Sequence, residues 1–469
     1  MTDLPLHALT LAEAAAGLRS GRFTALDLTR SYLDRIAESD DRIHAFATTC
    51  PDRALAEAEQ VTRAQRAGEC LGPLHGIPIA HKDVFLTCGL RTTANSHVFA
   101  DWVPGIDAAT VECFREKGAI TLGKTVCHEF AFGAPAAGDR FVPARNPWDL
   151  DLMPGSSSSG AGAAVAAGLC PIATGTDTGG SVRHPAAACG IVGLKPTRGR
   201  FSTVGVIALA PSLDTVGWLT RDVADQALIW PELAAAANPV SRAGIGSIDI
   251  GGVRLEGLRL GLSRDWLDRD SELARMHDPE ICNAFDEVRA RLAHWGVEWV
   301  PVELPPIADI IAAANQIICT EAAQQVGRWL HTGGPLGAGL QERLRQSSAG
   351  DLEAYHRALR VAQGWRSELD RMFREAGVAL LAAPGREQFP ETLESLMQSG
   401  SGPRTACNRL YSLTGHPALT LPMGLSARGL PMAIQFAAPA SEEARLLSIA
   451  GRLEREGLRL PQDAPLPWR

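Results

Sequence analysis

Apolar residues recur at helical spacing near the start of the chain. Leu28, Tyr32 and Ile36 lie on one face of a helix that Thr24 and Asp27 begin, with Asp in place of the usual Glu or Gln of a capping box. Further helices are expected over 54–66, over 108–117 with Asp107 as N-cap, over 352–375, and after Ser441 as the cap of a final helix.

Short apolar segments between these helices are typical of strands. One runs from Ile77 to Lys82, and the others are expected over 119–122, 170–174, after Gly190, over 378–382, and over 418–422 paired with 431–436. Residues 214–222 are expected to form a loop. Strands that alternate with helices indicate the α/β class. Because no linker divides the 469 residues, we expect one domain over 1–469.

Composition and charge restrict the class of protein. A hydrophobic content of 45% with 21% charged residues suits a soluble globular protein with a large core. The net charge is −8 without a basic cluster, so nucleic acid is not an expected partner, and no apolar run is long enough for a membrane span. Asp3 and Glu13 mark the start as a helix and not a signal peptide. We therefore expect a small-molecule partner.

The ten cysteines are scattered, without a Cys-x-x-Cys pair. In a chain of this length, such a distribution favours reduced thiols and a cytoplasmic protein. It also offers no ligand spacing for zinc, and no metal site is expected.

The stretch Gly175-Thr176-Asp177-Thr178-Gly179-Gly180-Ser181-Val182-Arg183 carries the strongest chemical signal. Glycines let successive backbone N–H groups approach one point, which suits a developing oxyanion. The Ser181 hydroxyl beside them is a candidate nucleophile. An ordinary Gly-Gly-Ser loop is the alternative interpretation.

Lys82 ends the apolar segment that begins at Ile77. A lysine buried at a strand end loses hydration, which lowers its pKa toward neutrality and makes it a candidate base. A salt bridge to a carboxylate is the alternative, and His81 beside it is expected to be structural.

Four serines, Ser156 to Ser159, precede a segment of small residues that ends at Gly168. Such a segment predicts a helix packed closely against its neighbours. A flexible linker is the alternative, but Pro154 before the serines and the apolar helix after them argue against it.

The segment from Gly118 to Thr125 matches the Walker A pattern. A phosphate-binding loop follows a strand and opens a helix, whereas this segment follows a predicted helix and its interior resembles a strand. Nucleotide binding is therefore not expected.

The three candidate elements suggest an unusual serine hydrolase. The Gly-x-Ser-x-Gly elbow is missing around Ser181, and no Asp or His stands out as its partner. A lysine base that acts through a second serine is a known alternative way to activate a serine.

With these pieces in this order, the chain resembles the amidase signature family. The matching motifs are Gly76-Ile77-Pro78 with Lys82-Asp83, Gly118 to Thr125 with Glu129 to Gly133, Arg145-Asn146-Pro147-Trp148, Pro154-Gly155 with the serines, Gly175 to Arg183, and Gly193 to Thr197. The strong match covers about 71–220, and weaker matches cover 9–68 and 405–456. The resemblance implies one α/β domain with a mixed, twisted sheet covered by helices on both faces. The resemblance implies that the enzyme needs no cofactor. It also implies that the chain forms a homodimer.

The resemblance assigns roles by position. The catalytic lysine falls on Lys82, the nucleophile on Ser181, and the bridging serine, which the family holds by a cis peptide, on Ser157, with Ser158 as the runner-up. The oxyanion donors correspond to the N–H groups of Thr178, Gly179, Gly180 and Ser181. We expect Asp177 and Arg183 to brace this loop, and Ala131, Phe132 and Gly133 to form part of the substrate pocket.

The chain departs from the family pattern in its serine loop. Ser156 and Ser159 stand where the family usually has glycines, Val126 replaces a common asparagine, and His184 stands where an apolar residue is frequent. A serine would be strained at either loop position if that position required a positive φ.

These assignments predict a hydrolase that cleaves a small carboxamide, or a urea-like amide, through an acyl-enzyme on Ser181. Such a reaction releases ammonia or an amine. One alternative is the amidase subunit of a tRNA-dependent amidotransferase, which acts within a complex. The other is an inactive homologue that only binds.

Overall fold

A computed structural model describes residues 5–69, 72–136, 139–234, 248–268, 270–347, 351–399 and 405–461. Within them, one mixed sheet of eleven strands has the order β1-β3-β2-β4-β6-β5-β10-β11-β9-β7-β8. The strands are β1 (Phe46–Thr49), β2 (Pro78–Lys82), β3 (Ile120–Thr125), β4 (Ile172–Asp177), β5 (Val192–Lys195), β6 (Thr215–Thr220), β7 (Arg259–Ser263), β8 (Glu298–Val302), β9 (Leu380–Pro384), β10 (Ala418–Leu425) and β11 (Pro431–Ala437).

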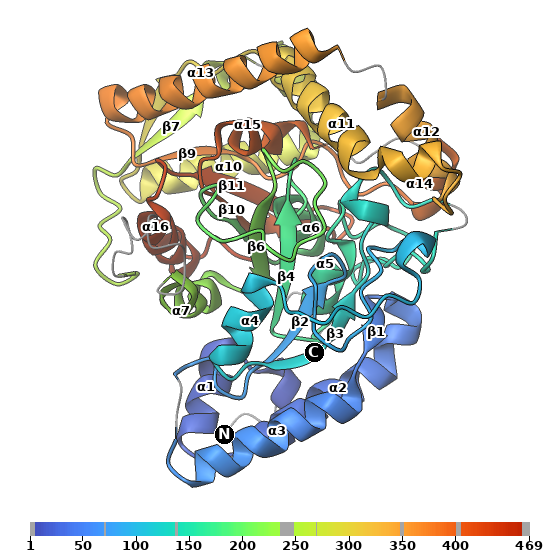
Figure 1. The fold of residues 1–469 in the computed structure, drawn as a ribbon. Helices are drawn as coiled ribbons and strands as arrows, with labels where there is room; N and C mark the ends of the chain where they lie inside the picture. The colour runs from blue at the N-terminus through green and yellow to red at the C-terminus, as the bar shows by residue number, and fades with distance from the viewer. Residues whose placement is uncertain are drawn as a thin grey trace.

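Helices surround this sheet (Figure 1). They are α1 (Leu11–Arg19), α2 (Ala25–Ile43), α3 (Pro51–Arg66), α4 (Ala109–Glu116), α5 (Ser159–Ala166), α6 (Arg183–Cys189), α7 (Val223–Ala234), α8 (Arg264–Leu267), α9 (Glu272–Arg275), α10 (Pro279–His294), α11 (Ile307–His331), α12 (Ala338–Ser347), α13 (Leu352–Ala376), α14 (Leu393–Ser399), α15 (Ala406–Thr414) and α16 (Glu443–Arg455). The predicted α/β fold with a mixed, helix-covered sheet is confirmed. No helix of the described chain combines the length and apolar composition that crossing a bilayer requires.

The centre of the sheet positions the candidate residues. Strand β2 lies between β3 and β4 and runs parallel to both, so the carboxyl ends of β2 and β4 meet at one edge. Lys82 ends β2, and Asp177 ends β4. Two segments almost a hundred residues apart are thereby brought together.

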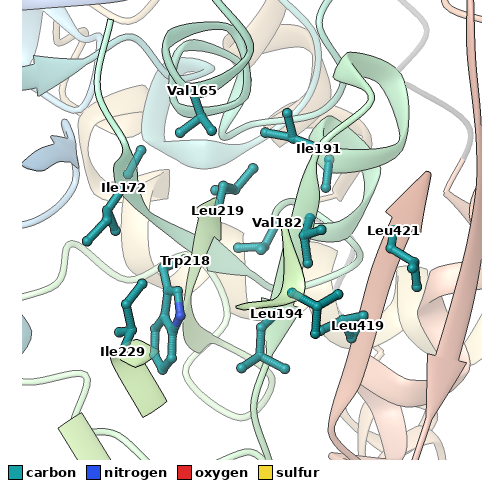
Figure 2. Packing of buried hydrophobic residues seen from close by; sticks show 14 of the residues in the cluster. Val165, Ile172, Val182, Ile191, Leu194, Trp218, Leu219, Ile229, Leu419 and Leu421 are labelled. Atoms are coloured by element: carbon teal, nitrogen blue, oxygen red, sulfur yellow. The ribbon is translucent and has the colours of Figure 1, made fainter. Parts of the chain in front are cut away.

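The core beneath this edge is built from β4, β5, β6 and β10. Figure 2 shows Val182 among Leu194, Leu219 and Ile191, and the side chain of Val182 is fully buried. The residue directly after Ser181 is therefore anchored in the apolar core.

Several sequence predictions of local structure are confirmed. Thr24 and Asp27 form a reciprocal capping box at the start of α2, so the shorter Asp closes the box as Glu does. The Walker-like segment forms β3, and Lys124 is buried against Asp83, 3.4 Å between Nζ and Oδ1, with the Phe85 carbonyl also accepting from it. This lysine is structural.

Other local predictions are wrong. Asp107 does not cap α4, because its carboxylate accepts hydrogen bonds from the N–H of Cys88 and from Arg115, and Ala108 is the N-cap. Ser441 does not cap the last helix, since it lies at φ +69° and Glu442 is the N-cap.

Residues 214–222 are not a loop. Most of them form β6, which is buried throughout and paired with β4 on one side and β5 on the other. The backbone partners come from two flanking strands, and this is information that the local sequence does not carry.

Nine cysteines lie in the described part of the chain, and none of them forms a disulfide. Cys70 and Asp3, on which two sequence arguments drew, lie outside the described residues.

Candidate active site

Lys82 is fully buried at the end of β2. Its Nζ donates to Ser157 Oγ at 2.9 Å and to Thr176 Oγ1 at 2.8 Å. The adjacent Asp83 pairs with Lys124 instead. No carboxylate of the described residues lies within ion-pair distance of Lys82. The alternative interpretation of Lys82, a salt bridge to a carboxylate, is therefore not supported.

Burial lowers the pKa of Lys82 to about 8, although Cys127, Asp214 and Asp177 oppose the shift. A substantial share of this amine is therefore neutral at mildly alkaline pH. A neutral amine in contact with a serine hydroxyl can accept its proton.

The serine loop is built without backbone strain at its serines. Gly155 has a φ of +119°, and a Cβ there would lie 2.5 Å from the Pro185 backbone, so this position requires glycine. Ser156 and Ser159 have no positive φ, and Ser159 is already the first residue of α5. The serines at positions 156 and 159 therefore introduce no positive-φ strain.

Ser157, and not the runner-up Ser158, contacts Lys82. The Ser158 hydroxyl faces the carbonyl of Thr176 at 3.4 Å. The cis peptide that the resemblance implies is not found, because every peptide bond of the described chain is trans, the form that non-proline residues favour by about 3 kcal/mol.

Ser181 lies between β4 and α6 and is half-buried. Ser157 and Ser181 line one pocket, but no hydrogen bond among the described residues joins their hydroxyls. Contacts of this kind are often looser without substrate than in the reacting complex.

Asp177 and Arg183 hold the loop that carries Ser181. Asp177 accepts hydrogen bonds from the N–H groups of Gly180 and Val182 and forms a fully buried ion pair with Arg183 at 2.8 Å. Burial raises the pKa of Asp177, but the charge and hydrogen bonds of Arg183 contribute to a net lowering to about 2. Arg183 also donates to the Gln435 side chain on β11, which ties the loop to the sheet.

The backbone N–H groups around Ser181 differ in availability. The N–H of Gly180 donates to Asp177 Oδ1 at 3.0 Å. Because this hydrogen bond occupies it, Gly180 is not available as the oxyanion donor that the resemblance implies. No hydrogen bond in the described chain engages the N–H of Thr178, Gly179 or Ser181. Gly180 serves the turn instead, with a φ of +123° and a Cβ position 2.8 Å from Asn408.

The pocket beside Ser181 has a volume of about 280 Å³. Its described lining comprises Ala131, Phe132, Gly133, Ser156, Ser157, Thr178, Gly179, Ser181, Leu209, Asn315, Ile318, Cys319, Arg343, Thr405 and Arg409. The three residues that the sequence places in the pocket are among them. The volume suits a small molecule.

Sequence reasoning gave no role to several polar residues of this region, among them two that support the site and two that line the pocket. Thr176 and Asp214 support the site, as partners of Lys82 and of the Thr178 hydroxyl. Arg343 and Arg409 line the pocket itself. No local pattern sets these arginines apart from ordinary helical surface residues, so only the fold could have revealed them.

Replacing Asp177 by Asn is expected to lower the free energy of unfolding by about 3–5 kcal/mol, because Arg183 is left as a buried charge without its partner. Denaturant unfolding measures the effect. As a matched control, Glu353→Gln removes the exposed pair with Arg357 and is expected to change stability by less than about 1 kcal/mol. Equal effects of the two substitutions would contradict the bracing role.

Comparison with known proteins places the chain in a family. The amidase family model matches residues 27–447. A glutamyl-tRNA(Gln) amidotransferase subunit of Moorella thermoacetica is 34% identical, over 96% of this chain and 97% of that protein. A crystal structure of an amidase has a TM-score of 0.84 at 30% identity, over 96% of this chain and 100% of that one. The peptide amidase of Stenotrophomonas maltophilia has a TM-score of 0.81 at 29% identity, over 98% and 99%.

The sequence motifs, the mixed α/β fold and these matches agree. The chain therefore belongs to the amidase signature family and is an enzyme that acts on amide C–N bonds.

Proposed function

We propose that the chain hydrolyses a small carboxamide through an acyl-enzyme on Ser181. One observation carries the proposal. Lys82, fully buried and without a carboxylate partner among the described residues, donates to Ser157, which lines the pocket that also holds Ser181. This is the arrangement that a lysine base acting through a bridging serine requires.

In the proposed reaction, neutral Lys82 accepts the proton of Ser157, which accepts that of Ser181. The Ser181 Oγ attacks the carbonyl carbon, and the N–H groups of Thr178, Gly179 and Ser181 bind the oxyanion. One such donor is typically worth about 3 kcal/mol.

The C–N bond then breaks, and the proton returns from Lys82 through Ser157 to the departing nitrogen. Water attacks the resulting ester, which releases the carboxylic acid and frees Ser181.

The rate should follow the ionisation of Lys82. Because the base must be neutral and its pKa lies at about 8, kcat/KM is expected to rise with pH and to level off above about pH 8. A pH–rate profile from pH 6 to 10 measures this. A rate that is independent of pH between 7 and 9 would contradict the role of Lys82 as base.

A second candidate is the amidase subunit of a tRNA-dependent amidotransferase. The 34% identity to the Moorella thermoacetica protein over nearly the whole chain favours it. The chemistry at Ser181 would be the same, but the ammonia would pass to a partner. An inactive homologue has less support, because Lys82, Ser157 and Ser181 are all present.

The two candidates differ in what the purified chain does alone. The hydrolase is expected to release ammonia from simple carboxamides without a partner. If release required the other amidotransferase subunits and tRNA, the second candidate would be correct. If neither preparation released ammonia, the inactive homologue would be correct.

A further inference from the structure

Two guanidinium groups line the pocket that holds Ser181. Arg343 comes from α12 and Arg409 from α15, so elements distant in sequence contribute them. The described lining contains no Asp or Glu. Neither arginine forms an ion pair with any described residue, so the described lining carries two positive charges and no negative one.

Arg343 packs against Phe132 and Gly133, two of the residues that the sequence places in the pocket. Its guanidinium carbon is 5.2 Å from the centre of the Phe132 ring, and no hydrogen bond to a described residue occupies its N–H groups. Gly133 has a φ of +87°, and a Cβ there would lie 3.3 Å from Arg343 Nε. The absence of a side chain at Gly133 leaves room for this arginine.

Among the described residues, the groups that accept hydrogen bonds from Arg409 are neutral. Its Nη1 donates to Asn315 Oδ1 at 2.5 Å, and its Nε approaches Thr405 Oγ1 at 3.5 Å. Burial lowers the pKa of Arg409, and the positive charge of Arg343 lowers it further, although Glu387 and Cys319 oppose the shift. Glu387 accepts the N–H of Cys407 and forms no ion pair with Arg409.

We propose that this pocket selects carboxamides whose acyl part carries a carboxylate and no ammonium group. Arg343 and Arg409 bind the carboxylate, and Ser181 attacks the amide at the other end. Succinamate and glutaramate represent the class. That these compounds are cleaved rests on the proposed function, whereas their binding does not.

The charges explain both parts of the preference. Guanidinium groups bind carboxylates through two parallel hydrogen bonds, which are stronger than bonds between neutral groups. A neutral amide leaves the arginines unpaired in a partly buried site. An amino-acid amide such as glutamine adds an ammonium group, which finds no carboxylate in the described lining and is repelled by both arginines.

Binding can be measured without turnover in the Ser181→Ala variant by calorimetry. Succinamate or glutaramate is expected to bind at least about 10-fold more tightly than butyramide, and more tightly than glutamine or asparagine. Butyramide or the amino acids binding as tightly as both acidic amides would overturn the proposal.

Arg343→Gln and Arg409→Gln, each in the Ser181→Ala background, are expected to weaken binding of the acidic amide at least about 10-fold, and to weaken binding of butyramide far less. Arg345→Gln is the matched control, because Arg345 lies on the same helix with its side chain 56% exposed. Thermal melts verify folding. Where a Gln variant fails to fold, Arg343→Lys or Arg409→Lys replaces it at the same position; each Lys keeps the charge and is expected to retain part of the preference. Unchanged binding in folded arginine variants would overturn the proposal.

The binding data separate this proposal from the proposed function. Tight binding of succinamate by Ser181→Ala with no cleavage by the unmodified chain would support the pocket and reject the hydrolase. Cleavage of butyramide that is as fast in the arginine variants as in the unmodified chain, without a preference for succinamate, would support the hydrolase and reject the pocket.

Discussion

Replacing Ser181 by Ala is expected to lower kcat/KM by about a millionfold, the scale seen when a serine hydrolase loses its nucleophile. The hydroxyl lost follows closely in the chain on Thr178 and Gly179, whose N–H groups no hydrogen bond of the described chain engages and which are the proposed oxyanion donors. Backbone hydrogen bonds to Asp177 hold the loop, so the variant is expected to fold. Ammonia release measures activity, and a thermal melt measures folding.

Ser158→Ala is the matched control for this substitution. It removes a neighbouring buried hydroxyl that faces the Thr176 carbonyl and not Lys82. We expect its kcat to stay within about 10-fold of the unmodified chain, since the lost bond is worth about 1 kcal/mol. A Ser181→Ala variant that kept more than a hundredth of the activity would mean that another group performs the attack.

Replacing Lys82 by Met is expected to lower kcat by about 10³–10⁴-fold, because it removes the general base. The long apolar side chain fills the same buried space but leaves the Ser157 and Thr176 hydroxyls without their partner. The rise of kcat/KM around pH 8 should disappear with the amine. Steady-state rates across pH, together with a thermal melt, measure both effects.

Thr176→Val provides the comparison for Lys82→Met. It removes the second partner of the amine, 2.8 Å away, and leaves the contact with Ser157. Its effect on kcat should be far smaller than that of Lys82→Met. Were a folded Lys82→Met enzyme to keep a tenth of the activity and the same pH profile, the proton would reach another base.

Much of the site could be predicted because its chemistry is local in sequence. Lys82 follows a short apolar run, and such a run predicts a buried strand end and therefore a lowered pKa. Ser181 and its glycines form one continuous stretch. The four serines form a second, within which the resemblance to the amidase signature family, and not the local pattern, singled out Ser157. The parallel pairing of β2 and β4 brings the end of β2, with Lys82, close to the stretch that leads to Ser181.

Other features depend on the tertiary structure. Arg343 lies in Gln341-Glu342-Arg343-Leu344-Arg345, a sequence that also fits a solvated helix face, and nothing local relates it to Arg409. Whether serine is strained at positions 156 and 159 also depends on which residue of the loop has a positive φ. In the structure that residue is Gly155, and neither serine has one. Asp107 has the residue type of an N-cap, but Arg115 and the Cys88 N–H use its carboxylate instead.

The central claim is that Ser181 is a nucleophile activated through Lys82. Labelling of the purified chain with a fluorophosphonate, followed by intact mass and peptide mapping, tests it most directly. The account predicts one adduct per chain, on the peptide that contains Ser181, and no adduct in folded Lys82→Met. An amide-cleaving preparation labelled at a different residue, or equal labelling of Ser181 in Lys82→Met, would contradict it.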